Sequence, residues 1–110
     1  MKYIVWLSLV KPIAMINCST NVNVKEGDDL ECLCYDTRGN PSPRALWYKH
    51  GKNIGEPKYF KKILSLNNIS KEVAGNYSCS VNNTVFEDVK QIEIQVQSKY
   101  DCWIWLLNKT

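Results

Sequence analysis

Cysteine has the widest chemical range in this chain, since a thiol can form a disulfide, bind a metal or attack a substrate. The 110 residues contain 5 cysteines, so at least one is left unpaired. Such a density in a short chain indicates an oxidising compartment, where disulfides supplement a limited core. Cys32 and Cys34 could begin a thiolate metal site, but strand alternation turns both toward the interior. We therefore expect neither a metal site nor another cofactor.

Residues for catalysis are scarce. His50 is the only histidine and stands beside Gly51 in a predicted turn, where it has no predicted nucleophile to activate. The acidic residues are scattered without a pair for general acid–base work, and the chain has no phosphate-binding glycine loop. We expect no enzymatic activity.

Asparagine offers a different chemistry, the acceptance of an N-linked glycan in the pattern Asn-X-Ser/Thr with X not proline. A random arrangement of the 11 Asn and 12 Ser or Thr residues would give about one such site, whereas the chain has five. Chance in an Asn-rich chain is the alternative, but together with the cysteines the number favours a secretory route. The predicted sites are Asn17, Asn68, Asn76, Asn82 and Asn108.

Positive charge gathers between residues 49 and 62, where only Glu56 opposes it. The net charge of +3 is well below that of a dedicated nucleic-acid binder, and aromatic residues for base stacking are lacking apart from Tyr59 and Phe60. We expect no nucleic-acid partner. The stretch indicates a weak site for an acidic polysaccharide such as heparan sulfate, or else a solvated hairpin; its cationic residues are Lys49, His50, Lys52, Lys58, Lys61 and Lys62.

These side chains must be positioned by strands, because the hydrophobic period between the chain ends is two. Leu30, Cys32 and Cys34 alternate with other residues, as do Ile92 and Ile94. Turn-rich segments at residues 37–43, 50–57 and 82–84 follow at the spacing of a β-sandwich. The length suits one domain. The sequence therefore predicts a single all-β sandwich domain.

The two ends fit this domain less well, and we place the domain itself at residues 12–97. Residues 1–11 have the character of a signal-like or truncated leader, with an apolar run cut short by Lys11 and Pro12. Residues 98–110 form a tail with six consecutive apolar residues, whereas a membrane-spanning helix needs about 20. We expect either a fragment of a longer extracellular or membrane protein or a complete small secreted one, with any membrane attachment through a missing part.

Several of these residues together resemble an immunoglobulin domain of the I-set or C2 type. Cys34 is followed 13 residues later by Trp47, and Tyr77 stands two residues before Cys79. Further matching positions are Gly27, Leu30, Gly39, Pro41, Pro43, Leu64, Leu66, Ile69 and Gly75. The resemblance implies an immunoglobulin-like β-sandwich of about seven antiparallel strands, or fewer. It also implies a Cys34–Cys79 disulfide beside Trp47 and a hydrogen bond from the Tyr77 hydroxyl to nearby backbone, with Gly75 permitting the tight backbone there.

The sequence departs from this family in three places. Val73 stands where most members carry an aspartate, so we expect the usual ion pair to be absent. Only 32 residues separate Trp47 from Cys79, which leaves little room for extra strands. Cys32 shares the inward face of Cys34 and could compete for Cys79, but we expect a buried free thiol. In the family's pairing of the first and last strands Cys18 and Cys102 lie tens of ångströms apart, so we expect no bond between them.

Domains that resemble this one serve mainly as protein-binding or spacer modules. The resemblance implies an extracellular protein-recognition module of an adhesion or receptor-type protein, which contacts another protein or itself. Alternation places Leu33, Tyr35 and Ile63 on the outer face of one sheet as a candidate interface, whereas a glycan on Asn76 would cover the other sheet. Polyanion binding and a passive spacer role remain as alternatives.

Overall fold

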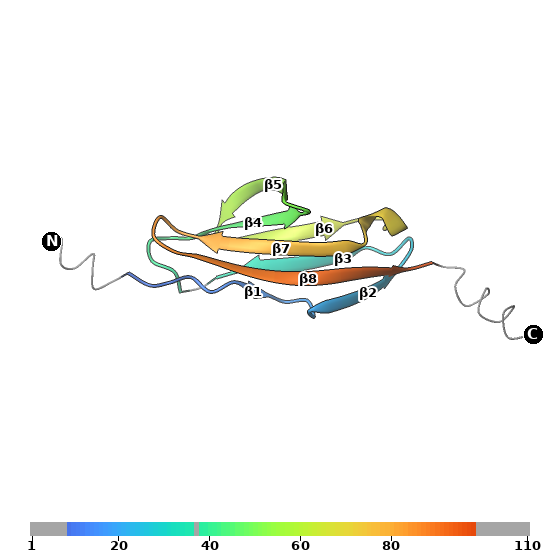
Figure 1. Ribbon diagram of the computed structural model, residues 1–110, viewed down its shortest axis with the longest axis horizontal. Coiled ribbons are helices and arrows are strands. Elements are labelled where there is room, and N and C mark those ends of the chain that lie inside the picture. Colours follow the sequence, from blue (N-terminus) through green and yellow to red (C-terminus); the bar gives the residue numbers. More distant parts are fainter. Residues whose placement is uncertain (1–8, 37, 99–110) are drawn as a thin grey trace, which may run out of the picture.

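A computed structural model describes residues 9–36 and 38–98, arranged as two β-sheets packed face to face (Figure 1). Most of the expected leader and tail, with Cys102 and Asn108, lies outside these ranges. One sheet has the order β1-β3-β6, formed by β1 (Met15–Ile16), β3 (Leu30–Tyr35) and β6 (Lys61–Leu66). The other has the order β2-β8-β7-β4-β5, formed by β2 (Asn21–Lys25), β8 (Glu87–Gln97), β7 (Gly75–Asn82), β4 (Arg44–Lys49) and β5 (Lys52–Tyr59). The all-β sandwich class is confirmed.

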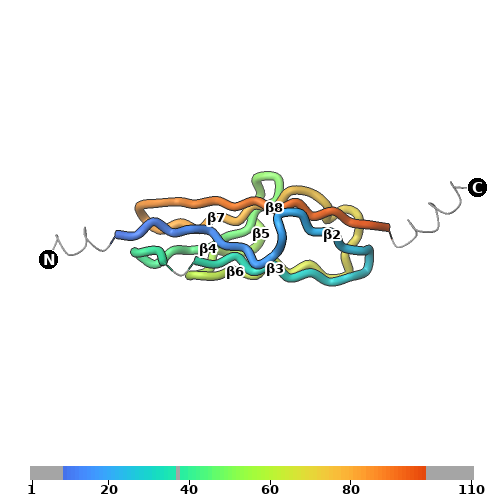
Figure 2. Tube along the Cα trace, turned by 90° about the horizontal axis from the view of Figure 1, so that it is seen from below, coloured from blue at the N-terminus to red at the C-terminus, as the bar shows by residue number. Residues whose placement is uncertain are grey.

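The first strand of the sandwich is divided between the two sheets. β1 pairs antiparallel with β3, whereas β2 pairs parallel with β8. Figure 2 shows the segment between them turning from the side of β3 toward β8. This division brings the number of described strands to eight, so the expectation of seven or fewer was wrong in that detail.

The segment at residues 50–57, for which the sequence predicts a turn, is mostly strand. The turn itself occupies His50 and Gly51, whose φ angles are 52° and 76°. β5 then runs back along β4 with Lys52 opposite Lys49 and Tyr59 opposite Arg44. The polar residues of β5 misled the prediction because this strand lies at a sheet edge and is almost entirely exposed. The described residues contain no helix long and apolar enough to cross a membrane.

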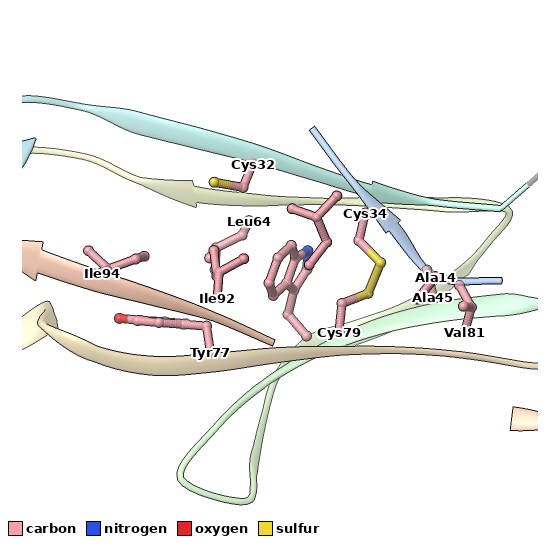
Figure 3. Packing of buried hydrophobic residues seen from close by; sticks show 12 residues of the cluster. Ala14, Cys32, Cys34, Ala45, Leu64, Tyr77, Cys79, Val81, Ile92 and Ile94 are labelled. Atoms are coloured by element: carbon pink, nitrogen blue, oxygen red, sulfur yellow. A yellow bond between two sulfur atoms is a disulfide. The ribbon is translucent and has the colours of Figure 1, made fainter. Parts of the chain in front are cut away.

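The core lies between the sheets and is centred on the Cys34–Cys79 disulfide, which spans the two layers (Figure 3). Both cysteines and Trp47 are 0% exposed, and the Trp47 indole N–H donates a hydrogen bond of 3.0 Å to the Lys62 carbonyl oxygen. The indole therefore buries a large apolar surface without leaving its polar group unsatisfied. Labelled neighbours in Figure 3 include Leu64, Tyr77, Ile92 and Ile94.

Tyr77 lies near the start of β7 and links the core to the segment that precedes this strand. Its hydroxyl donates a hydrogen bond of 2.6 Å to the carbonyl oxygen of Val73, at the end of the short 3₁₀ helix η1 (Lys71–Val73). Gly75 begins β7 with φ of 141°, a conformation that side chains disfavour. Leu66 is half-buried and lies opposite Leu30. The contacts of Trp47, Tyr77, Gly75 and Leu66 are thus those of residues that stabilise the fold.

A second disulfide joins Cys18 to Cys32, so the expectation of a free Cys32 thiol was wrong. That expectation placed Cys18 alongside the last strand of the sandwich. In the structure, Cys18 lies in the segment that crosses between the sheets, directly after β1 has paired with β3. The crossing brings the Cα atoms of Cys18 and Cys32 to 5.5 Å, which is typical disulfide spacing. Because Cys18 is bonded to Cys32, it is not available for a disulfide with Cys102.

Candidate functional site

The outer face of the β1-β3-β6 sheet carries a group of apolar side chains. Leu33 lies directly opposite Ile63, and Tyr35 lies opposite Met15, so these four share one surface. Ile63 is 51% exposed and Met15 43%, while Leu33 and Tyr35 are half-buried. We call these four residues the outer apolar patch. The three residues named from the sequence come together here, and the structure adds Met15.

Lysine side chains border the patch on one side. Leu33 and Ile63 line a shallow cleft of about 240 Å³ together with Lys58, Lys61 and Lys62. β5 and β6, which carry these lysines, are the edge strands of their sheets. Lysines on edge strands discourage pairing with the strands of other molecules, which gives this charge a structural role as well. The patch thus has an apolar centre and a basic rim.

The other predicted cationic residues lie elsewhere. Lys49 and Lys52 face each other beside the β4–β5 turn, about 20 Å along β5 from Lys58 at the rise per residue of a strand. The Lys49 ammonium group lies 5.1 Å above the ring of Tyr77 and donates a hydrogen bond of 3.0 Å to the Glu72 carbonyl oxygen. His50 is exposed in the turn. The stretch that is continuous in sequence therefore forms two separate groups in space.

The four predicted glycan acceptor residues in the described ranges are all exposed, but they lie in different places. Asn76 and Asn82 both point outward from β7, on the face opposite to the outer apolar patch. Asn68 follows β6, and its backbone N–H donates to an Asp29 carboxylate oxygen. Asn17 lies beside the patch, because its side-chain oxygen accepts a hydrogen bond of 2.8 Å from the Leu33 backbone N–H.

Within residues 9–36 and 38–98, no cluster of side chains offers a metal site or a free thiol. No group of three or more His, Cys, Asp or Glu side chains in these ranges could hold a metal ion. Cys32 and Cys34 are both disulfide-bonded, so neither sulfur is a thiolate ligand.

The sandwich, its buried intersheet disulfide and the hydrogen-bonded Tyr77 define a β-sandwich domain of the immunoglobulin type. The family model described as "Immunoglobulin domain" matches residues 11–83. The chain belongs to this family.

Comparison with known proteins agrees with this assignment. The chain is 36% identical over 90 residues to mouse junctional adhesion molecule B, covering 70% of this chain and 30% of that protein. It is 32% identical over 94 residues to rat limbic system-associated membrane protein, covering 84% of this chain and 27% of that protein. The chain thus spans less than a third of the length of each of these relatives.

Solved structures show the same fold. The four N-terminal immunoglobulin domains of Dscam1 isoform 4.44 match with a TM-score of 0.68 and 27% identity, over 80% of this chain and 21% of that one. The titin tandem domains A164–A165 match with a TM-score of 0.68 at 16% identity, over 83% of this chain and 51% of that one, which is a likeness of fold alone.

Proposed function

We propose that this chain is an extracellular protein-recognition domain of a cell-adhesion or receptor-type protein. The observation that carries the proposal is the outer apolar patch. Two disulfides suit an oxidising compartment, and relatives include proteins named as an adhesion molecule and as a B-cell receptor. The bound partner is a second copy of this chain or another surface protein.

The side chains of the patch indicate what kind of surface a partner should present. Exposed aliphatic area costs roughly 25 cal/mol per Å² relative to burial, so Ile63 and Met15 provide a driving force for contact. The neighbouring lysines Lys58, Lys61 and Lys62 favour a partner with acidic groups around an apolar centre. Because a stable interface buries roughly 800 Å² on each side, the patch would form its centre and the lysines part of its rim.

Introducing a carboxylate into the patch should abolish this binding. We expect Ile63→Glu to weaken partner or self-association by tenfold or more, which corresponds to about 1.4 kcal/mol or more, since the charge must be desolvated in the interface. Sedimentation equilibrium of the secreted chain and binding to cells that display the partner measure the effect. Val89→Glu is the matched control, because Val89 is 54% exposed on the outer face of the other sheet.

Two results would contradict the patch as the interface. Wild-type binding by Ile63→Glu would exclude it, and a loss caused by Val89→Glu would move the interface to the β7–β8 sheet. Asn17 provides an independent check, because a glycan at this residue would lie over Leu33. Although Asn17 matches the acceptor pattern, use of the patch as an interface requires that it carry no glycan, so glycopeptide mapping of the secreted chain should find Asn17 unmodified.

A second candidate function is binding of a sulfated polysaccharide, which the spacing of Lys58, Lys61 and Lys62 around one cleft favours. Changing these three lysines to glutamate should remove retention on heparin at low salt, and wild-type retention should fall as salt rises and screening increases. The double change Lys49→Glu with Lys52→Glu is the control, since those lysines lie at the other end of β5. Unchanged retention in the triple variant excludes this function. A chain that shows neither retention nor partner binding would be a spacer.

A further inference from the structure

A second and larger groove lies where β7 turns toward β8, at the end of the sandwich shown on the left of Figure 1. It measures about 860 Å³ and is lined by residues from β4, from the junction of β5 and β6, and from the end of β7. The lining residues used below are Arg44, Tyr59, Phe60, Asn82 and Thr84. Pockets of roughly 300–1,000 Å³ hold ligands of drug-like size, which is also the size class of a disaccharide.

Three of these residues form a row across neighbouring strands. Asn82 of β7 lies directly opposite Arg44 of β4, which in turn lies directly opposite Tyr59 of β5. Residues that are opposite each other in a sheet point to the same face, so all three side chains project outward. At a strand spacing of about 4.8 Å, the backbones of Asn82 and Tyr59 are about 10 Å apart. A group attached to the Asn82 side chain is therefore within reach of both Arg44 and Tyr59.

Aromatic rings form one wall of the groove. Tyr59 is 57% exposed and Phe60 47%, and their ring centroids are 6.4 Å apart. The Arg44 guanidinium lies 4.9 Å from the centroid of the Tyr59 ring and donates a hydrogen bond of 3.0 Å to its hydroxyl. This contact holds the Tyr59 ring in place although the ring is exposed, and guanidinium N–H groups remain to donate to a ligand.

The opposite wall is held by Asn83. Its side-chain N–H groups donate to the carbonyl oxygens of Val10 and Pro41, at 3.4 and 3.1 Å. Its side-chain oxygen accepts from the backbone N–H groups of Val85 and Phe86, at 2.9 and 2.8 Å. The turn that follows Asn82 is thus tied to two other segments of the chain, and the groove is formed before anything occupies it.

Asn82 is the acceptor of the sequence Asn82-Asn83-Thr84, which meets the requirement for N-glycosylation. We propose that the glycan on Asn82 occupies this groove, with its first N-acetylglucosamine residues packed on Tyr59 and Phe60. A pyranose ring presents apolar C–H groups on its faces and polar groups at its rim. The aromatic rings match the former, and Arg44 donates hydrogen bonds to the latter.

Covalent attachment makes this contact effective although each interaction in it is weak. The glycan is tethered to a residue of the groove itself, so its binding is intramolecular and pays no cost of association from solution. Occupancy would cover two aromatic rings that the sandwich otherwise leaves in water. The proposal requires only passage through the secretory route and is independent of the outer apolar patch, which lies on the other sheet.

Site-resolved removal of glycans from the native secreted chain tests the proposal. Peptide N-glycosidase needs access to the sugar bonded to asparagine, so a glycan held in the groove should be released from Asn82 slowly. Tyr59→Ala should raise the rate at Asn82 by about tenfold, the factor that one well-packed aromatic contact contributes. Tyr59→Phe, which keeps the ring, should retain the slow rate. Asn76 on the same strand and face should show the same rate in all three proteins, measured by glycopeptide mass spectrometry.

The direct measurement that needs no variant is nuclear Overhauser contact between sugar protons and the Tyr59 ring in the wild-type chain. An unglycosylated Asn82, an unchanged release rate in Tyr59→Ala, or an absence of these contacts would each overturn the proposal. Thr84→Ala removes the glycan and leaves Asn82 in place. If added chitobiose shifts the Tyr59 resonances equally in this variant and in the glycosylated chain, the groove is open to a glycan from another molecule, and the proposal is wrong.

Discussion

Removal of the Cys34–Cys79 disulfide is expected to lower the free energy of unfolding by about 4 kcal/mol, the value that the chain-entropy model gives for the 45 residues it closes. Small domains have a total stability of roughly 5–15 kcal/mol, so this loss would leave the domain marginal or unfolded at 37 °C. The double change Cys34→Ala with Cys79→Ala isolates this bond. Urea unfolding at 25 °C and thermal unfolding followed by circular dichroism measure the change.

The position of this bond explains why its loss is not compensated elsewhere. Both cysteines are 0% exposed and lie in different sheets, so the bond fixes the distance between the layers around Trp47. Alanine at both positions also removes buried sulfur atoms and leaves space in a close-packed core. A loss below about 1 kcal/mol in the double variant would show that packing alone holds the layers together.

The second disulfide should contribute less and act on a smaller part of the domain. Cys18–Cys32 closes 14 residues, for which the same model gives about 3 kcal/mol. We expect Cys18→Ser with Cys32→Ala to remain folded at 25 °C, because the Cys34–Cys79 bond is intact. Alanine is chosen at Cys32 because this residue is 0% exposed and a hydroxyl there would be buried.

Hydrogen exchange distinguishes the local effect of this bond from its global effect. Cys18 lies at the start of the segment that leads to β2, so its release should speed the exchange of β2 amides more than that of β7 amides. The Cys34→Ala/Cys79→Ala variant provides the comparison, since loss of the Cys34–Cys79 bond should speed amide exchange in both strands together. Equal acceleration in β2 and β7 on loss of Cys18–Cys32 would show that the bond stabilises the whole sandwich and not the first strand in particular.

The fold class and the core were accessible from the sequence because they depend on short-range patterns. The alternation in Leu30–Tyr35 and in residues 92–96 fixes which side chains face inward, whatever the partner strand is. The same alternation placed Leu33, Tyr35 and Ile63 on an outer face. Asn76 and Asn82 could also be recognised as acceptor sites from three consecutive residues each.

The partner of Cys32 could not be found in this way. It depends on the first strand leaving the β1-β3-β6 sheet after Ile16 and joining the other sheet at Asn21, which places Cys18 over β3. No local pattern marks such a crossing, because both halves of the strand pair with segments that are distant along the chain. Met15 was missed as part of the outer apolar patch for the same reason, since its neighbour Tyr35 is brought to it only by β1–β3 pairing.

The sequence by itself determined strand alternation, the inward and outward faces and the chemical type of each site, since these are properties of residues close together in the chain. Only the tertiary structure decided which distant residues meet. It separated Lys49 and Lys52 from Lys58, Lys61 and Lys62, and it aligned Asn82, Arg44 and Tyr59 across three strands. The physical reason is that strand register is set by packing of the two sheets over a shared core, and that packing is a property of the whole chain.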